Sequence, residues 1–123
     1  MGHLSKLTLE NFRNYSRADL SFEAGLTIFH GENGQGKTSL LEAVYFLSLL
    51  RSFRTRNVQN LKSWQKDTFD ISGTLEHEDL LADLLQVSYG EKRKLQMNGN
   101  PINRSSEFIR QINAISFTPE DIE

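Results

Sequence analysis

Apolar and polar residues alternate over several short stretches of the chain, which is typical of half-buried β-strands. The stretches are 4–9, 18–22, 69–76, 80–89 and 92–97. Turn formers separate them, and Asn98-Gly99 is a strong signal for a tight hairpin. The alternation therefore predicts a small antiparallel layer at the N-terminus and a β-meander with one polar face over 67–104.

Residues 39–50 follow a different period. This segment contains no Gly or Pro, and its few polar side chains recur every third residue, at Ser39, Glu42, Tyr45 and Ser48. On a helix this spacing makes one narrow polar stripe and leaves the other faces to be buried. Upstream, Leu26-Thr27-Ile28-Phe29-His30 is a short β-branched and aromatic run, typical of a buried strand. A strand, a loop and a helix in this order predict an α/β core.

The loop between that strand and that helix fits the phosphate-binding pattern G-x-x-x-x-G-K-[ST] at every fixed position. Its residues are Gly31, Glu32, Asn33, Gly34, Gln35, Gly36, Lys37 and Thr38. The glycines let backbone N–H groups curl around a phosphate, and the helix N-terminus favours the same anion. Lys37 supplies a cation for the β- and γ-phosphates, and Thr38 a hydroxyl ligand for Mg²⁺. We therefore expect a nucleotide site over residues 31–38.

The charges are unevenly distributed along the 123 residues. Residues 1–66 carry 9 basic and 5 acidic side chains, whereas residues 67–123 carry 5 and 11. No acid interrupts five cations after the predicted helix, at Arg51, Arg54, Arg56, Lys62 and Lys66. This segment is expected to be irregular with one short helical turn. Its cations either track phosphates of DNA or nucleotide, or form a solvated loop after a helix C-terminus, where cations are favoured. Both interpretations stay open.

Composition and the remaining clusters exclude several classes of function. The chain is 37% hydrophobic, has no cysteine and has no apolar run long enough for a membrane, so we expect a soluble cytoplasmic protein without thiol chemistry. Glu76-His77-Glu78-Asp79 is expected to be a solvated turn, because neighbouring strand residues point to opposite faces. Asp70-Ile71-Ser72-Gly73 has the D-x-x-G form of GTPases, but no Asn-Lys-x-Asp for guanine accompanies it.

The last part of the chain, 105–123, predicts a short helix over 107–113, a strand over 114–117 and a helix that starts at Thr118-Pro119. No apolar run ends in Asp-Glu, the acidic pair with which a phosphate-loop ATPase holds Mg²⁺ and positions water. We therefore expect an N-terminal piece whose site is completed downstream. ATP hydrolysis is expected of the full-length protein and is expected to be negligible in this chain alone.

Four blocks of the chain, in this order, resemble the RecF family of bacterial recombination mediators. They are Asn11-Phe12-Arg13-Asn14-Tyr15, residues 31–45, Ser52-Phe53-Arg54-Thr55 and Phe117-Thr118-Pro119-Glu120-Asp121. The resemblance implies an α/β P-loop NTPase lobe of the ABC/SMC type with an antiparallel β subdomain. Its parts would be a P-loop core with N-terminal strands over 1–66, the meander over 67–104 and the short C-terminal elements over 105–123.

The resemblance also implies a function. It indicates the ATP-binding lobe of a DNA repair and replication protein, which binds single-stranded and gapped duplex DNA in an ATP-dependent manner during recombinational gap repair and the SOS response. ATP and Mg²⁺ would lie between two protomers of a homodimer, RecR and RecO would be partners, and no membrane would be involved.

By position, residues 31–38 would hold the phosphates, Thr38 the Mg²⁺, and Arg13 would lie near the nucleotide. Ser39 stands where the family commonly has Asn, and Pro119-Glu120-Asp121 stands near the point where ABC relatives use a Gln. From the residues alone, a P-loop phosphotransferase that acts on a small metabolite is the alternative.

Overall fold

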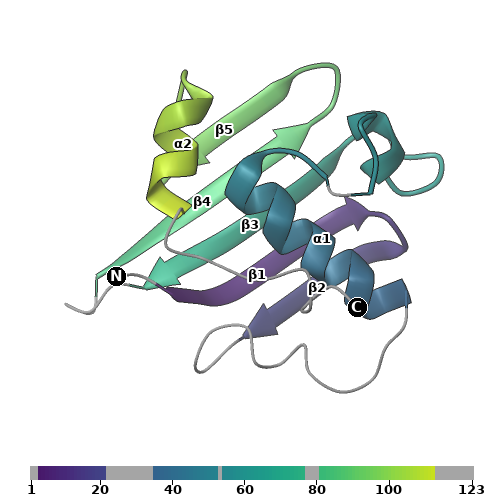
Figure 1. The fold of residues 1–123 in the computed structure, drawn as a ribbon, viewed down its shortest axis with the longest axis horizontal. Coiled ribbons are helices and arrows are strands. Elements are labelled where there is room, and N and C mark those ends of the chain that lie inside the picture. Colours follow the sequence, from purple (N-terminus) through teal and green to yellow (C-terminus); the bar gives the residue numbers. More distant parts are fainter. Residues whose placement is uncertain (1–2, 22–34, 53, 77–80, 113–123) are drawn as a thin grey trace.

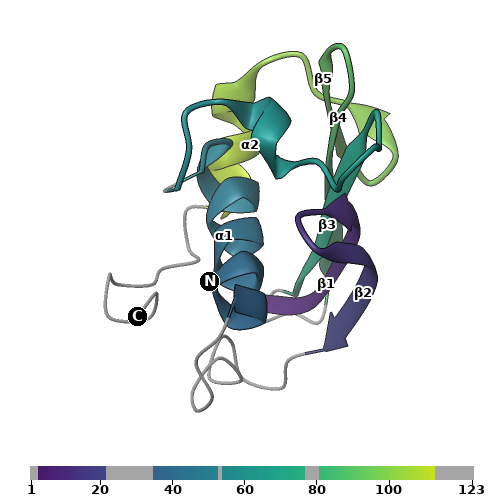
Figure 2. The same ribbon diagram turned by 90° about the vertical axis from the view of Figure 1, so that its right-hand side faces the viewer.

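The computed structural model describes residues 3–21, 35–52, 54–76 and 81–112. Two layers make up this part of the chain, with an antiparallel six-stranded sheet on one side and helices on the other (Figures 1 and 2). The strands are β1 (His3–Phe12), β2 (Tyr15–Ser21), β3 (Phe69–Glu76), β4 (Ala82–Tyr89), β5 (Arg93–Met97) and β6 (Asn100–Pro101). The helices are α1 (Gln35–Leu49), the 3₁₀ helix η2 (Val58–Leu61) and α2 (Ser105–Ile112).

The sheet has the order β2-β1-β3-β4-β5-β6. Strand β1 pairs with β2 on one edge and with β3 on the other, so that Leu7 lies opposite both Leu20 and Gly73. The N-terminal strands and the meander, which the sequence presents as two separate stretches, are therefore one continuous sheet. This pairing brings residues near the N-terminus into contact with residues some seventy positions later.

The strands predicted within the described residues are confirmed, with some differences in their bounds. Strand β3 spans the alternating stretch 69–76, with its odd-numbered residues buried and its even-numbered residues facing outward up to the exposed Glu76. Asn98 and Gly99 connect β5 to β6, with φ angles of 54° and 83°. Positive φ at both central residues is the geometry of the tight hairpin turn that Asn-Gly favours.

Helix α1 packs across the buried face of the sheet through aromatic side chains. The Phe46 ring lies 5.7 Å from Phe69 and 5.8 Å from Tyr89, and Phe12 contacts the other side of Phe69 at 5.6 Å. Gly73 lets the helix come close, because a Cβ there would lie 2.5 Å from a methyl of Leu47. This contact places α1 directly over β3.

The extent of α1 agrees with the prediction, but the exposure of its polar stripe does not. Ser39, Glu42 and Ser48 are only 2%, 0% and 6% exposed, although the pattern predicts that the rest of the helix, and not this stripe, is buried. The stripe is covered because Arg13 and the segment after the helix fold over it. Leu49, which the pattern assigns to the buried surface, is instead 39% exposed.

Other predicted elements have mixed outcomes. We call residues 51–66, which carry the five cations, the basic segment. The short helical turn expected there is η2, and the helix expected at 107–113 is α2. The predicted strands over 26–30 and 114–117, and the helix start at Thr118, lie outside the described residues. Within the described residues, no helix has both the length and the apolar character needed to cross a membrane.

Candidate nucleotide site

Helix α1 begins inside the phosphate-binding pattern. Gly31, Glu32, Asn33 and Gly34 lie outside the described residues, whereas the backbone of Gln35, Gly36, Lys37 and Thr38 forms the first turn of α1. The N–H groups of a first helical turn have no partners within the helix and carry a partial positive charge. The start of α1 therefore offers the anion-binding helix end that the sequence predicts.

Arg13, the predicted neighbour of the nucleotide, lies in the two-residue connection between β1 and β2. Its φ angle is 52°, a conformation that is uncommon for a residue with a side chain. Its N–H donates to the carbonyl of Leu61 at 2.8 Å, and its own carbonyl accepts from the Ser63 hydroxyl at 2.7 Å. The backbone of Arg13 is therefore held on both sides by the basic segment, which fixes where its side chain starts.

The Arg13 guanidinium binds Glu42 on α1 as a bidentate pair. Nε donates to Oε1 and Nη2 to Oε2, both at 2.8 Å. The Glu42 side chain is 0% exposed and the Arg13 side chain is 22% exposed. Two parallel charge-assisted hydrogen bonds fix the plane of the guanidinium as well as its position. The structure thus holds Arg13 against α1, one helical turn after Thr38.

A second arginine reaches the same carboxylate from the segment after α1. Arg54 Nη1 donates to Glu42 Oε1 at 3.2 Å and to the Ser39 hydroxyl at 3.4 Å. The Ser52 hydroxyl donates to Glu42 Oε2 and accepts the backbone N–H groups of Arg54 at 2.9 Å and Thr55 at 3.2 Å. We call Arg13, Ser39, Glu42, Ser52 and Arg54 the Glu42 cluster.

The Glu42 cluster carries one carboxylate and two guanidinium groups, so it has one surplus positive charge. Among the described residues, no buried side-chain nitrogen or oxygen lacks a hydrogen-bond partner. The buried Glu42 carboxylate is therefore fully hydrogen-bonded within the cluster, and the net charge of the cluster suits a neighbouring polyphosphate.

The sequence predicts Arg13 as a site residue, but it does not predict that Glu42 and Arg54 belong to the same site. Two signals were present, since Glu42 interrupts an otherwise apolar helix and Arg54 lies in the Ser-Phe-Arg-Thr block that carries the family resemblance. Neither signal says that the two side chains meet, because 12 residues separate them in the sequence.

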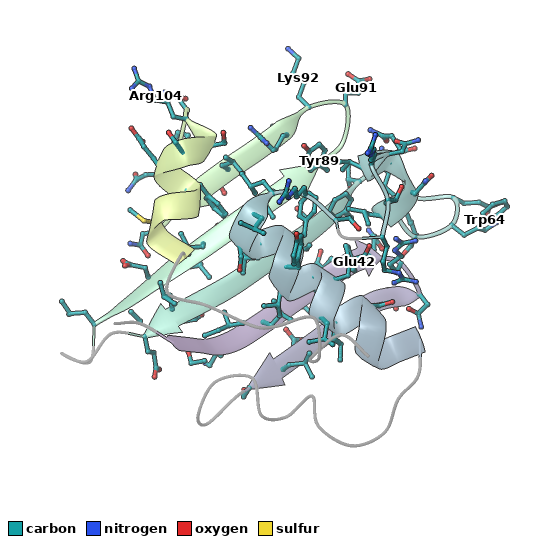
Figure 3. The ribbon with its side chains drawn as sticks, in the orientation of Figure 1. Glu42, Trp64, Tyr89, Glu91, Lys92 and Arg104 are labelled. Carbon is teal, nitrogen blue, oxygen red and sulfur yellow. The ribbon has the colours of Figure 1, made fainter. Side chains whose placement is uncertain are left out.

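The basic segment also borders a hollow of about 320 Å³ beside the Glu42 cluster. The described residues that line it include no acid; they are Tyr45, Arg51, Ser52, Thr55, Arg56 and Val58. Farther along the segment, the Trp64 side chain is 87% exposed and extends away from the body of the molecule (Figure 3). Two cations and no carboxylate make this hollow suited to an anion.

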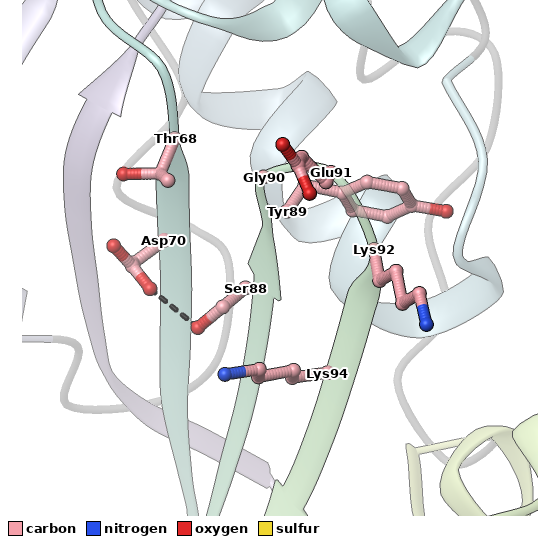
Figure 4. Close-up of a pocket in the computed structure, with 8 residues that line it drawn as sticks. All are labelled: Thr68, Asp70, Ser88, Tyr89, Gly90, Glu91, Lys92 and Lys94. Atoms are coloured by element: carbon pink, nitrogen blue, oxygen red, sulfur yellow. Dashed lines mark hydrogen bonds between the residues drawn. The ribbon is translucent and has the colours of Figure 1, made fainter.

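A larger hollow, about 520 Å³, lies on the outer face of the sheet where β3, β4 and β5 meet (Figure 4). Its charges are mixed, because Asp70 and Glu91 line it together with Lys92 and Lys94. Asp70 accepts a hydrogen bond from Ser88 on the neighbouring strand. The D-x-x-G match thus lies within a strand, not in a phosphate-binding loop, which argues against the GTPase interpretation.

Ion pairs on the outer face of the sheet differ from the Glu42 cluster in exposure. Arg17 binds Glu10 and Asp19, and its side chain is 58% exposed. The hydrogen bond from Arg17, followed by one from Thr8, lowers the pKa of Asp19 below its usual value. Among the described residues, no group of three or more His, Asp or Glu side chains has the arrangement of a metal site. His77, Glu78 and Asp79 lie outside those residues.

The chain was compared with known proteins. A family model described as an AAA domain matches residues 6–121. Among curated proteins, the DNA replication and repair protein RecF of Halalkalibacterium halodurans is 38% identical over 120 residues, and that of Streptococcus gordonii is 40% identical over 120 residues. Both alignments cover 98% of this chain, but only 32% and 33% of the relatives. The chain thus spans about a third of the length of the relatives it matches.

Two solved structures are similar to this chain in fold as well as in sequence. One described as the recombination mediator protein RecF-ATP in the RecFOR pathway superposes with a TM-score of 0.77 and 29% identity, over 88% of this chain and 30% of that one. Another, described as RecF-ATPrS in the same pathway, gives a TM-score of 0.75 and 28% identity over 87% and 29%. The chain therefore belongs to the AAA domain family and resembles, within it, the N-terminal part of the RecF proteins.

Proposed function

We propose that this chain is the ATP-binding lobe of a RecF-like DNA repair and replication protein. The observation that carries the proposal is the start of α1 within a complete phosphate-binding pattern, with a cluster of surplus positive charge beside the following turn of the helix. A helix N-terminus with a nearby cationic group is a ready-made site for a phosphate chain. Similarity to structures named RecF-ATP and RecF-ATPrS points to ATP as the nucleotide.

Within this proposal, residues 31–38 hold the phosphates through backbone N–H groups and Lys37, and the Thr38 hydroxyl is a ligand of Mg²⁺. Arg13 lies near the nucleotide, held there by Glu42. When bound, Mg²⁺ would help to neutralise the phosphate charge, and Lys37 and the backbone N–H groups of residues 31–38 would supply further compensation. In the whole protein, water would attack the γ-phosphate and ADP would leave, with help from groups in the rest of the protein.

For the whole protein we propose ATP-dependent binding to single-stranded and gapped duplex DNA in the cytoplasm, during gap repair and the SOS response. RecR and RecO are the proposed partners, because the structural relatives are named for the RecFOR pathway. ATP between two protomers of a homodimer is part of the same proposal. The hollow that Arg51 and Arg56 line is a candidate DNA contact, because it offers two cations and no carboxylate.

A P-loop phosphotransferase that acts on a small metabolite is not favoured. The curated relatives bear the name of a DNA replication and repair protein. A hollow of about 520 Å³ among the described residues lies on the outer face of the sheet, the face opposite α1, and not at the start of α1 where the proposed site holds the phosphates.

The first test is nucleotide binding by the chain itself. Isothermal titration with Mg-ATP should show a single site for the unsubstituted chain, and Lys37→Met should weaken binding at least about tenfold, because one charge-assisted contact to phosphate is lost. Lys6→Met on the exposed outer face is the matched control and should bind normally. If the chain binds no ATP, or if Lys37→Met binds as well as the control, the proposed nucleotide site is refuted.

A further inference from the structure

Glu42 is an unusual residue for its position. It lies in the middle of α1 with a side chain that is 0% exposed, while Leu41 and Ala43 on either side of it are equally buried in the apolar core. Burying a carboxylate is costly unless it is paired and fully hydrogen-bonded. Here both oxygens are satisfied, by Arg13, Arg54 and Ser52. A leucine would cover the sheet at a lower cost, so the carboxylate calls for an explanation beyond packing.

Helix geometry places this carboxylate one turn from the phosphate site. Residues four apart on a helix lie on the same face, so Glu42 follows Thr38 along the axis by one turn. Arg54 bridges this interval, because its Nη1 group reaches both Ser39, the next residue after Thr38, and Glu42. The guanidinium of Arg54 therefore lies beside the second turn of α1, the turn that follows Thr38.

Both arginines are supplied by backbone that is itself constrained. Arg13 has a φ angle of 52° and bonds through its N–H and its carbonyl to the segment after α1. The Arg54 N–H is tied to the Ser52 hydroxyl, which in turn donates to Glu42. Unfavourable backbone conformations persist where the surrounding structure enforces them, and they concentrate at functional sites. The two side chains thus converge on one carboxylate from fixed starting points.

We propose that Glu42 is a positioning residue, whose buried carboxylate holds the guanidinium groups of Arg13 and Arg54 beside the start of α1 so that their surplus positive charge acts on the phosphates of the bound nucleotide. This inference rests on the proposed nucleotide-binding function and extends it to three residues outside the phosphate-binding pattern. Glu42 itself touches no phosphate in this arrangement. It acts through the two arginines that it binds.

The sign of the effect separates this role from a simple charge effect. If Glu42 acted only as a negative charge near the phosphates, its removal would strengthen the binding of a polyanion. If it positions the two arginines, its removal lets them repel each other and turn toward solvent, and binding weakens. A purely structural role predicts a lower melting temperature with unchanged affinity of the folded protein.

The experiment compares Glu42→Gln with the unsubstituted chain, using Mg-ATP and inorganic tripolyphosphate as probes. Glutamine keeps the shape and removes the charge, so we expect the dissociation constants for both probes to rise about tenfold, as when one charge-assisted hydrogen bond is lost. Glu10→Gln is the matched control, because Glu10 also pairs with an arginine but is exposed on the outer face. It should leave both affinities unchanged. Melting temperatures by circular dichroism show whether each variant is folded.

A folded Glu42→Gln variant that binds either probe as tightly as the unsubstituted chain, or more tightly, would overturn the proposal. Should that variant not fold, Arg54→Lys decides, because lysine keeps the charge but replaces the planar guanidinium, whose Nη1 contacts both Ser39 and Glu42, with a flexible ammonium that has no second nitrogen for an anion. We expect it to weaken ATP binding, and unchanged affinity would overturn the proposal. Absence of ATP binding by the unsubstituted chain would instead refute the proposed function, and the inference with it.

Discussion

The bond between Arg13 and Glu42 allows a quantitative test of how burial controls the strength of an ion pair. Arg13→Met removes two hydrogen bonds of 2.8 Å from a carboxylate that is 0% exposed, while it keeps most of the apolar length of the side chain. Removal of one partner from a buried pair costs about 3–5 kcal/mol. Arg54 and Ser52 still bind Glu42 in the variant, so we expect a loss near the lower limit, about 3 kcal/mol in the free energy of unfolding.

Arg17→Met is the matched control. Arg17 also binds carboxylates, those of Glu10 and Asp19, but its side chain is 58% exposed and its partners are 44% and 58% exposed. Exposed pairs contribute little because water and salt screen them. We therefore expect a much smaller loss of stability from Arg17→Met than from Arg13→Met, although the two substitutions are chemically identical.

The assay is urea unfolding followed by far-ultraviolet circular dichroism, without nucleotide, so that ligand binding adds nothing to stability. Fluorescence is unsuitable, because the single tryptophan, Trp64, is already 87% exposed in the folded state. Thermal unfolding, followed in the same way, should give a melting temperature about 10 °C lower for Arg13→Met than for the unsubstituted chain. This difference should depend little on salt. If Arg13→Met is no less stable than Arg17→Met, the Glu42 carboxylate does not depend on Arg13 and the estimate is wrong.

Two further predictions concern packing and acid stability. Gly73→Ala should destabilise the chain by about 1–3 kcal/mol, because the added Cβ would lie 2.5 Å from a methyl of Leu47. Gly90→Ala should cost less, because its nearest contact would be at 3.0 Å. Urea unfolding of the two variants compares these losses. Arg17 lowers the pKa of Asp19 in the folded state. The ionised Asp19 carboxylate therefore contributes stability at a pH above its usual pKa of 3.8, and this contribution is lost as the pH falls through the folded-state pKa. Asp19→Asn should therefore reduce the acid dependence of unfolding in that range, and an unchanged acid titration curve would contradict this cause.

Much of the local structure follows directly from the sequence. The alternation over 69–76 predicts β3 with its correct bounds, and Asn98-Gly99 predicts the hairpin turn. The phosphate-binding pattern predicts a helix that starts within it, as α1 does. These predictions succeed because strand and helix periods depend on neighbours one to four residues apart, and because a turn is set by the backbone preferences of two residues.

The tertiary structure decided what became of the polar stripe on α1. The sequence pattern assigns Glu42 to an exposed stripe, since a charged residue in an apolar helix usually faces water. In the fold, the stripe is buried, because Arg13 and Arg54 arrive from segments 29 and 12 residues away and supply the opposite charge. No local period encodes such a meeting.

The same reason applies to the sheet as a whole. The sequence predicts the strands of the N-terminal layer and of the meander, but it does not predict that β1 pairs with β3 to join them. Pairing between distant strands depends on which apolar faces can be covered together, here by α1 through Phe46 and the close approach at Gly73. The sequence by itself thus determined the described strands and helices and the phosphate-binding pattern. The fold decided which charged side chains lie together against α1, because those contacts arise only when distant segments pack together.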